Sequence, residues 1–561
     1  MVCSLTRTAA TEVVNKFASA NLRLPESAIG TLHSHAFRAL GMPKIATGAE
    51  LTDWNRDHPT LALQEGEPVD MDDPDYEKMA ARGRGEGDRR MELYELCRHR
   101  RTPRPWPDEV EGFAKQWEEW KSANGMKDFT DLIVDAEAEI PFPPFMPRVM
   151  LADEAQDLSR LEYDLLRKWG AACEALFIVG DGWQALYSWR GSDPSILSDD
   201  SVPPERCKVL AQSYRVSKAV HAAAIKWISR HLSTYAPIEY RPTPMEGAVE
   251  VMPNDCHLGQ PDAIVREARR ELDAGKSVMI QATCSYMLPA IIHELRDQGI
   301  PFANPWRRRR GDWNPLATRA NSVSMAQRLL DFLRPDAATY GPAEGTRAEQ
   351  EAALMAASMR RENPYTILTG SRGWTDVELH RWTDALKVSE IFQFGMRAHF
   401  AKLAETAPDC DTKILDPDDL DMIFKSDSAE LLRAWMVDEG LVASVPTSKA
   451  LTWWESHLLS GKKEAAKFPL TVARKSGAQA LMEAPRCFVG TVHSFKGSEA
   501  DVVIVLPDLS PSGMDEWHGQ KVQKDAIARM FYVALTRARE KVLLSHQRVR
   551  GCGVPLTDCL S

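Results

Sequence analysis

Residues 149–192 constrain the fold of this chain most, because short apolar runs there are each followed by polar residues. Residues 149–152 form an apolar run short enough for a buried parallel strand, and Asp153 and Glu154 follow it directly. A helical stretch and a second apolar run, 176–180, come next. Open α/β sheets bind ligands at the carboxyl ends of their strands, so the pattern predicts an α/β fold with a site at the acidic pair.

Two adjacent carboxylates in this position can have different roles. Asp153 would hold a Mg²⁺ through water, and Glu154 would polarise a water for attack on a phosphoryl group. Gln184, beyond the second run, is a neutral side chain able to sense both a phosphate and a neighbouring water. An isolated acidic pair is more often a solvated strand end or a helix cap, so the surrounding sequence has to decide.

Aromatic and basic side chains follow at once. Tyr187 and Trp189 offer flat faces next to Arg190, a combination that suits stacking against single-stranded bases. The formal net charge of −11, from 69 basic and 80 acidic residues, excludes a basic field over the whole chain. A nucleic-acid contact must therefore be a local groove.

Bulk properties limit the remaining classes. A length of 561 residues predicts about four domains. The ten cysteines contain no C-x-x-C pair, which argues against a zinc site of that type. No run of 18 apolar residues and no apolar segment after a basic start occur, so we expect an intracellular, cytoplasmic protein.

The sequence DEAQD followed by GDGWQALYSWRG resembles motifs II and III of the UvrD/Rep/PcrA-like superfamily 1 DNA helicases. The resemblance implies two RecA-like parallel-sheet lobes with mainly helical insertions in each, ATP and Mg²⁺ as cofactors, and 3′-to-5′ movement on single-stranded DNA. It also implies that Glu154 is the general base, Gln184 the γ-phosphate sensor, and Asp153 the magnesium carboxylate. The DNA contacts implied here are Tyr187, Trp189 and Arg190.

Two earlier segments resemble motifs Ia and Ib, which line the DNA. Residues 2–13 correspond to motif Ia, which implies DNA contacts by Thr6 and Arg7. Residues 29–40 correspond to motif Ib, and a Thr-x-His-Ser of this kind taken alone would be read as a helix cap with a packed histidine. The residues implied to contact the DNA backbone are Thr31, His33 and Ser34.

Residues 208–220 resemble motif IV, in which a strand ends at residues 212–215 and a helix begins. The resemblance implies that Tyr214 stacks on a base of the cofactor and that Arg215 reaches a phosphate, to which a guanidinium is well suited. An arginine that caps a sheet edge is the alternative for Arg215.

Residues 487–506 resemble motif V, and 527–545 resemble motif VI. Motif V implies Thr491 and His493 on the DNA side, Gly497 for close backbone approach, and Glu499 near the ribose of the nucleotide. Motif VI implies a helix that delivers Arg537 from its last turns onto the γ-phosphate, where it would stabilise transition-state charge. The alternative for Arg537 is a surface salt-bridge face.

We expect the following domains. The first RecA-like lobe comprises 1–40 and 128–213, with a helical insertion over 41–127 that includes a flexible segment, 66–90. Residues 128–134 return the chain to the sheet. The second lobe comprises 214–315 and 484–550, with a helical insertion over 316–483, and residues 551–561 form a tail. The basic, tryptophan-containing cluster 305–315 is either a DNA-backbone contact or a solvated charge run.

The phosphate-binding loop of the family is missing, because G-x-x-x-x-G-K-[ST] occurs nowhere in the sequence. Gly275-Lys276-Ser277 does not replace it, since Arg270 stands at the glycine position and the apolar run comes afterwards. We therefore expect an N-terminally truncated helicase that binds MgATP poorly. The alternative is a non-catalytic subunit that binds single-stranded DNA, or serves in assembly, and kept the helicase fold.

Overall fold

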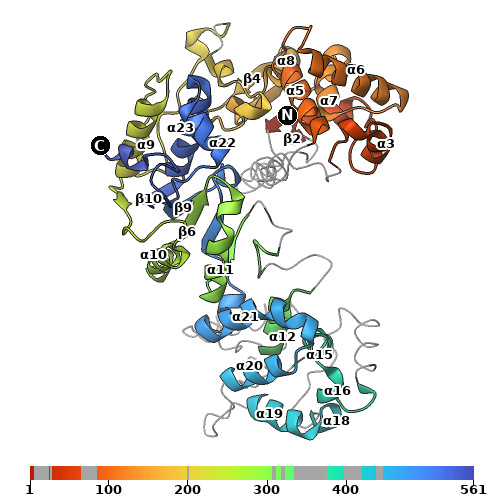
Figure 1. Ribbon diagram of the computed structural model, residues 1–561, viewed down its shortest axis with the longest axis vertical. Helices are drawn as coiled ribbons and strands as arrows, with labels where there is room; N and C mark the ends of the chain where they lie inside the picture. The colour runs from red at the N-terminus through yellow and green to blue at the C-terminus, as the bar shows by residue number, and fades with distance from the viewer. Residues whose placement is uncertain are drawn as a thin grey trace. The chain divides into compact units, whose positions relative to one another are not determined.

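The computed structural model describes residues 1–4, 25, 28–64, 85–198, 201–305, 307, 311–316, 323–333, 374, 376–396, 398, 420–436 and 447–561. The chain divides into two compact units, Met1–Pro289 with Gly490–Ser561, and Ala290–Val489. Two parallel sheets with helices around them confirm the predicted α/β fold of two RecA-like lobes (Figure 1). Thr6 and Arg7 lie outside the described residues.

The first lobe is built on a four-stranded parallel sheet in the order β2-β1-β3-β4. The polar tips predicted after residues 152 and 180 share one edge of the sheet, because Ala152 of β3 pairs with Ile178 of β4. Its strands are β1 (Val2–Ser4), β2 (Ile29–Thr31), β3 (Val149–Ala152) and β4 (Ala175–Ile178).

Three helices, α2 (Leu32–Ala39), α7 (Phe129–Glu139) and α8 (Arg160–Gly170), pack on this sheet. In α8 the apolar residues recur at helical spacing, so that Leu165 and Trp169 are buried in the core of the lobe. Residues 128–134 return the chain to the sheet as the start of helix α7, which Asp128 caps.

The described residues between 41 and 127 include the helices α3 (Glu50–Asp57), α5 (Glu86–His99) and α6 (Asp108–Ala123). Their core is aromatic: the ring of Trp54 lies 5.0 Å from that of Trp117 and 5.6 Å from that of Trp120. Residues 86–90, expected within a flexible segment, instead form the first turn of α5, because Glu86 and Asp88 favour a helix N-terminus.

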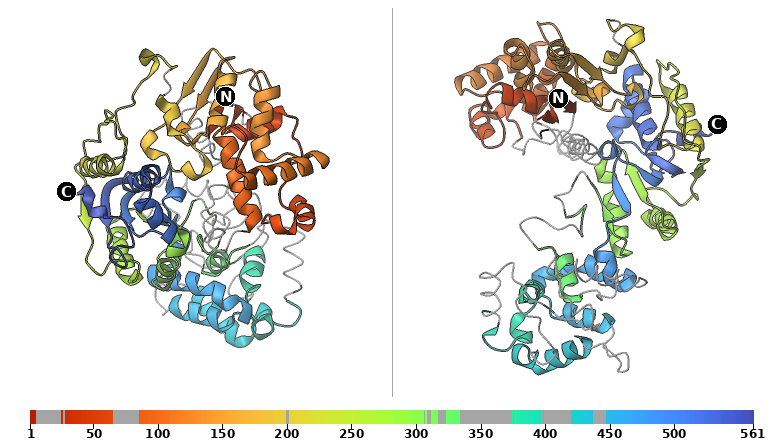
Figure 2. Two further views of the ribbon diagram at one scale, coloured as in Figure 1. Left: turned by 45° about the horizontal axis from the view of Figure 1, so that its top comes forward. Right: turned by 180° about the vertical axis from the view of Figure 1, so that it is seen from behind.

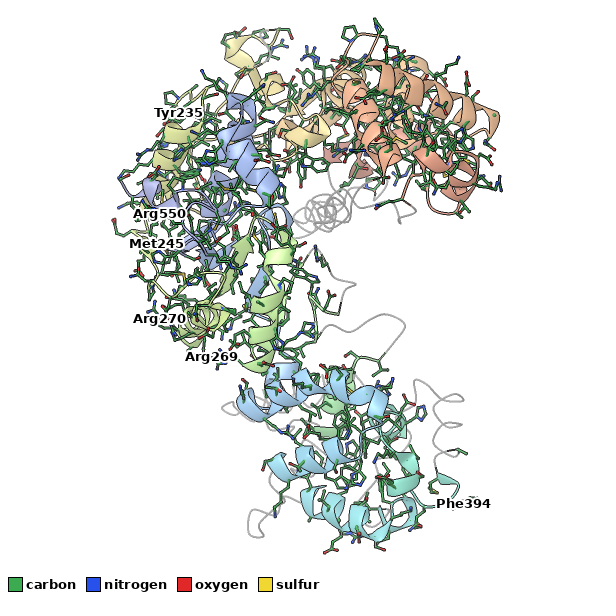
Figure 3. All side chains as sticks on the ribbon, in the orientation of Figure 1. Tyr235, Met245, Arg269, Arg270, Phe394 and Arg550 are labelled. Atoms are coloured by element: carbon green, nitrogen blue, oxygen red, sulfur yellow. The ribbon has the colours of Figure 1, made fainter. Side chains whose placement is uncertain are left out.

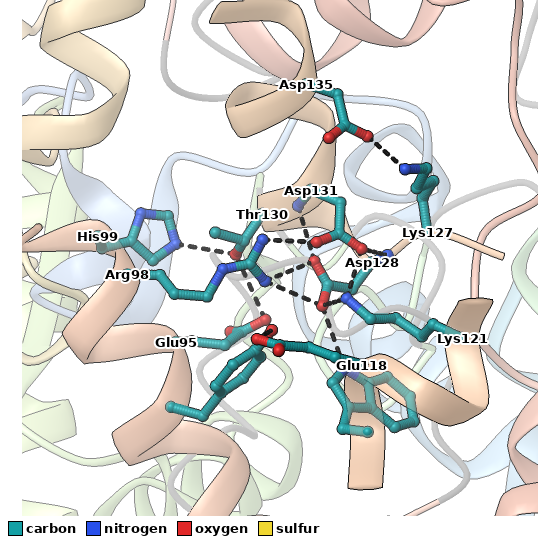
Figure 4. Close-up of polar contacts among 12 residues, drawn as sticks. Glu95, Arg98, His99, Glu118, Lys121, Lys127, Asp128, Thr130, Asp131 and Asp135 are labelled. Carbon is teal, nitrogen blue, oxygen red and sulfur yellow. Dashed lines mark hydrogen bonds and ion pairs between the residues drawn. The ribbon is translucent and has the colours of Figure 1, made fainter. Parts of the chain in front are cut away.

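A buried ion network joins these helices to α7 (Figure 4). Arg98 of α5 donates to Asp128 at 3.0 Å and to Asp131 at 2.5 Å. Lys121 of α6 contacts the same two carboxylates, and the indole of Trp117 donates to Asp128 at 3.1 Å. Two cations face two anions, so the charges balance in an interior where an unpaired charge would be costly.

The second sheet has the order β5-β10-β9-β6-β8-β7, and each pairing recorded for it is parallel. Its central strands are buried on both faces, as expected for a parallel sheet covered by helices. The strands are β5 (Ala248–Val251), β6 (Val278–Ala282), β7 (Phe302–Ala303), β8 (Cys487–Thr491), β9 (Ala500–Val505) and β10 (Ala538–Leu544).

Helices α9 (Lys218–His231), α22 (Pro511–His518) and α23 (Lys521–Leu535) lie side by side at this second lobe (Figure 1). Between residues 249 and 303 the predicted alternation is confirmed, with α10 (Pro261–Asp273) and α11 (Pro289–Asp297) between the strands. Residues 275–277 follow α10 and precede β6, an order opposite to that of a phosphate-binding loop.

The strand predicted before residue 212 is wrong. Residues 207–211 have no regular structure, Leu210 is 80% exposed, and Gln212 makes a single bridge to Arg241. An apolar run becomes a strand only where a neighbour takes its backbone hydrogen bonds, and none of the strands described in this structure pairs with it.

The second unit contains an aromatic helical core. The ring of Phe332 lies 4.9 Å from Trp435 and 5.1 Å from Trp382. In the basic cluster 305–315, Arg307 is buried with its guanidinium 4.1 Å from the ring of Trp313, while 306 and 308–310 fall outside the described ranges. Besides α11, the helices that the structure describes in this unit include α12 (Met325–Leu333), α15 (Asp376–Thr383), α19 (Ser426–Met436), α20 (Thr447–Ser456) and α21 (Lys463–Ser476).

The last residues of the chain pack against α9 (Figure 2). Asp558 lies 3.2 Å from Nε2 of His231, and Nζ of Lys226 donates to the carbonyl of Leu560 at 3.1 Å. Residues 551–561, expected as a tail, are therefore held by α9. Among the helices of the described segments, none is long and apolar enough to cross a bilayer.

Candidate functional site

The acidic pair lies in the turn after β3. Glu154 has a left-handed backbone, with φ 54°, and its N–H donates to Oδ1 of Asp153 at 3.0 Å. A left-handed conformation is uncommon for a residue other than glycine, and such strain gathers at functional turns. The turn places two carboxylates directly after the end of the strand.

The carboxylate of Glu154 has two polar partners. Nε2 of Gln156 lies 2.5 Å from its Oε2, and Nζ of Lys496 lies 3.2 Å from the same oxygen. Burial opposes the charge, but Lys496 and Gln156 lower the pKa of Glu154 below its ordinary value. The side chain is therefore ionised, as a base must be to accept a proton.

Lys496 is a site residue that the sequence analysis missed. It is buried, follows β8, and its ammonium also contacts the buried carboxylate of Asp157. Its Nζ lies 5.7 Å from the centre of the Tyr187 ring. The signal available in the sequence was a lysine between Phe495 and Gly497, directly after the Thr-x-His-Ser of motif V.

A second group of polar residues surrounds the tip of β4. Gln184 donates to Oδ2 of Asp181 at 2.7 Å and accepts from Nη2 of Arg537 at 3.0 Å. Burial raises the pKa of Asp181. Arg537 is 1% exposed, and burial, with the nearby charge of Arg215, lowers its pKa to about 10. The first lobe thus supplies the amide and the second supplies the guanidinium.

The position of Arg537 differs slightly from the prediction. Helix α23 ends at Leu535, so Arg537 lies in the turn before β10 and not in the last turn of the helix. Its Nε donates to the carbonyl of Val533 at 3.1 Å, which fixes the side chain against the end of the helix.

Arg215 donates to Glu499 at 2.6 Å, and Arg539 lies 3.3 Å from the other oxygen of that carboxylate. Burial opposes the charge of Glu499, but Arg215 and Arg539 lower its pKa. Tyr214 is 91% exposed, which leaves its ring open to a flat ligand. Gly497 has φ +82°, so this position needs glycine for its conformation.

Motifs Ib and V repeat the same five-residue pattern, G-T-x-H-S, at 30–34 and 490–494. In both copies the threonine Oγ1 accepts from the serine N–H, at 3.1 and 3.3 Å, and the serine Oγ donates to the threonine carbonyl at 2.8 Å. The two lobes therefore present the same turn after a strand. The residues concerned are Thr31, Ser34, Thr491 and Ser494.

The histidines of these repeats, His33 and His493, are neutral. Burial lowers the pKa of each to about 4. His33 lies 3.7 Å from the buried carboxylate of Glu162, and the ring of His493 lies 6.0 Å from that of Tyr187, which is also buried. Neutral rings can donate or accept hydrogen bonds but add no charge for a phosphate.

Trp189 and Arg190 differ in exposure. Trp189 is 42% exposed, so much of its ring remains open to solvent. The Arg190 side chain is 9% exposed and forms an ion pair with Glu162 of α8 at 3.2 Å. Burial opposes the charge of Glu162. The positive charge of Arg190, with contributions from His33 and His99, nevertheless lowers the pKa of Glu162 to about 2.

The side chains present fit the γ-phosphate end of a nucleotide with magnesium. Arg215 and Arg537 lie close enough for mutual repulsion, which a phosphate between them would relieve. Within the described part of the chain, no three acidic, histidine or cysteine side chains cluster as a metal cage.

Two protein-family models match the chain. The UvrD/REP helicase N-terminal domain matches residues 1–203, and the UvrD-like helicase C-terminal domain matches residues 486–545. A probable DNA helicase II homolog of Mycoplasma pneumoniae is 29% identical over 120 residues, which are 19% of this chain and 17% of that protein. The ATP-dependent DNA helicase PcrA of Staphylococcus aureus is 38% identical over 74 residues, 13% of this chain and 10% of the relative.

The matched segments therefore span less than a fifth of the length of these relatives. The two family models, however, contain the turns at Glu154 and Gln184 and the turn at Arg537. In residues 1–203 and 486–545 the chain is therefore similar to the N-terminal and C-terminal domains of the UvrD/Rep/PcrA-like helicases.

Proposed function

We propose that this chain acts as the motor core of an ATP-dependent DNA helicase or translocase that moves 3′ to 5′ on single-stranded DNA. The observation that carries the proposal is the hydrogen bond from Arg537 to Gln184, which joins residues from both lobes beside Glu154. A site shared between lobes can couple events at a phosphate to relative movement of the lobes.

Each residue has a role in this scheme. Arg537 and Arg215 stabilise negative charge at the γ-phosphate, and the ionised Glu154 orients a water and accepts its proton. Asp153 contributes a carboxylate to Mg²⁺ through water. ATP, when bound, supplies the phosphoanhydride whose cleavage drives movement. Tyr214, Gly497 and Glu499 belong to the nucleotide side of the site.

The DNA side consists of the two G-T-x-H-S turns and the exposed ring of Trp189. Trp189 would stack on a base, which is tolerant of sequence because every base offers a flat face. The buried ring of Tyr187 lies beside the ring of His493. It also packs against Trp189, with the two ring centres 6.3 Å apart, and so helps to hold Trp189 in place. The ion pair of Arg190 with Glu162 favours a role in positioning the loop that carries Trp189 over a direct contact with DNA.

The absence of G-x-x-x-x-G-K-[ST] from this sequence makes a second function worth stating. In a phosphate-binding loop of this kind, backbone amides and the lysine hold the β- and γ-phosphates. We therefore propose that this chain binds MgATP weakly. A non-catalytic single-strand-binding or assembly subunit is the alternative that this absence favours.

Hydrolysis of γ-labelled ATP at millimolar MgATP, with and without oligothymidylate, distinguishes the two. A motor core should hydrolyse ATP slowly with stimulation by DNA, and Glu154→Gln should lower the stimulated rate by about 100-fold. Glu174→Gln, at the exposed opposite end of the sheet, should not. DNA binding without hydrolysis, unaffected by Glu154→Gln, would favour the non-catalytic subunit.

A further inference from the structure

We propose that Trp183 is a positioning residue that seats the Gln184 loop of the first lobe in an aromatic socket of the second lobe. The functional consequence of this inference rests on the proposed function, because that proposal assigns Gln184 to the γ-phosphate. Its structural content does not depend on hydrolysis and can be measured separately.

Trp183 lies in a short, well-fixed turn. Its N–H donates to Oδ1 of Asp181 at 2.9 Å, while the other oxygen of Asp181 accepts from Gln184 at 2.7 Å. Asp181 therefore holds the backbone of one residue and the side chain of the next. Trp183 and Gln184 move together, because they are adjacent and share this carboxylate.

The indole of Trp183 points into the second lobe and is only 6% exposed. It stacks on Tyr235 at 5.3 Å between ring centres and meets Tyr532 edge-on at 5.6 Å. Tyr532 belongs to α23, and Tyr235, labelled in Figure 3, belongs to the segment that follows α9. Stacked and edge-to-face arrangements are the favourable geometries for aromatic pairs.

Hydrogen bonds within the second lobe hold the socket together. Ser233 donates its N–H and its hydroxyl to the two oxygens of Asp525 of α23, at 2.7 and 2.6 Å. The indole of Trp227 in α9 donates to the carbonyl of Ala528 at 2.8 Å. These bonds fix the segment that carries Tyr235 to α23 without any contribution from Trp183. The socket thus has hydrogen bonds of its own, which do not involve Trp183.

Two contacts then link the same loop to the same end of α23. Trp183 packs on Tyr532, and Gln184 accepts from Arg537, which follows α23 directly. The aromatic contact buries apolar surface and involves no nucleotide atom. It therefore keeps Gln184 opposite Arg537 whether or not a phosphate lies between the lobes.

Hydrogen–deuterium exchange of the full chain without nucleotide tests this. Trp183→Ala should speed exchange about fivefold or more in peptides covering 181–190 and 521–537, while Trp183→Phe, which keeps a stacking ring, should restore most of the protection. Trp189→Ala is the matched control from the same loop, and it should leave 521–537 unchanged. Unchanged exchange in Trp183→Ala, or failure of Trp183→Phe to restore protection, overturns the proposal.

A second variant approaches the socket from the other side. Asp525→Asn weakens the bonds to Ser233 and should loosen residues 181–190, although it touches neither Trp183 nor Gln184. It gives an independent answer if Trp183→Ala does not fold. Protection of 181–190 that does not change in Asp525→Asn contradicts a socket held by these bonds.

Kinetics separate this inference from the proposed function. If the chain hydrolyses ATP, Trp183→Ala should lower kcat about tenfold with KM changed less than about twofold, since it misplaces a sensor and removes no nucleotide contact. A raised KM with unchanged kcat contradicts positioning. If the unmodified chain does not hydrolyse ATP, the proposed function fails, and the exchange experiment alone decides the role of Trp183.

Discussion

Nζ of Lys496 lies 3.2 Å from Oε2 of Glu154, and the same ammonium contacts the buried carboxylate of Asp157. Lys496 follows β8 of the second sheet, whereas the two acids follow β3 of the first. One cation therefore joins the lobes at the proposed catalytic base. It keeps Glu154 ionised and occupies one of its oxygens.

Replacement of Lys496 by methionine should destabilise the fold by about 3 kcal/mol, because it leaves Asp157 buried without its cation. Lys496 also lowers the pKa of Glu154 against the effect of burial, so their contact adds stability above the ordinary carboxyl pKa and loses it as pH falls. Urea denaturation from pH 4 to 7 should show a flatter profile for the variant.

The matched control is Lys218→Met, which removes the cation of an exposed pair with Glu246. An exposed pair contributes at most about 1 kcal/mol. If both lysine variants cost the same, the contact of Lys496 with the two acids does not stabilise the fold.

Glu95 of α5 should make stability depend on pH in the opposite sense. Burial, helped by the charge of Asp128, raises the pKa of Glu95 to about 7. A carboxyl with a raised folded pKa favours folding below its unfolded pKa and loses that contribution as pH rises through about 7. Glu95→Gln should therefore raise the melting temperature at pH 8 and change it little at pH 4.

At pH 8 the ionised and partly buried Glu95 should lower the free energy of unfolding by about 1–3 kcal/mol. Thermal denaturation at pH 4 and pH 8 measures it, with Glu109→Gln, an exposed carboxyl on α6, as the control. An equal response of both variants to pH would show that Glu95 is ionised normally.

Much of the fold follows from local sequence. Residues 149–152 and 278–282 are mainly apolar runs that become parallel strands, and polar residues follow the first of them as predicted. The run before residue 212 has a similar character and forms no strand, because strand formation needs a neighbouring strand as well as a propensity. Local pattern cannot supply that second condition.

The residues of the candidate site also fall into two groups: those that sequence motifs identify, and those that only the fold brings together. Glu154, Gln184 and Arg537 stand in recognisable motifs, and the structure brings them together. Lys496 and Asp157 are separated by 339 positions, and Trp183 meets Tyr532 through the fold alone. Contacts between lobes depend on tertiary placement, so no periodicity or spacing in one segment reveals them.

Gly497 should resist substitution because of its backbone. Its φ of +82° is costly for any residue with a Cβ, so Gly497→Ala should destabilise the fold by about 1 kcal/mol or more and displace the adjacent Lys496. Gly112→Ala is the opposite control: it lies inside α6 with open space around a new Cβ and should stabilise by about 0.5–1 kcal/mol. Equal effects in urea denaturation would refute the conformational argument.

Arg190 offers a test of how the exposed Trp189 is held. Arg190→Met leaves Glu162 buried without its cation, so it should cost about 3 kcal/mol of stability in urea. If Arg190 does not touch DNA, the dependence of oligothymidylate affinity on salt concentration should keep its slope. A phosphate contact by Arg190 would instead reduce that slope by about 0.7 on logarithmic axes.

Trp189→Ala is the complementary variant, since it removes a stacking ring and no charge. It should weaken oligothymidylate binding by about 1–3 kcal/mol with the salt slope unchanged and little loss of stability.

A reduced slope in Arg190→Met together with unchanged stability would assign Arg190 to the DNA. Lower stability with an unchanged slope would assign it to Glu162, and the loop that presents Trp189 would then be anchored by a buried ion pair.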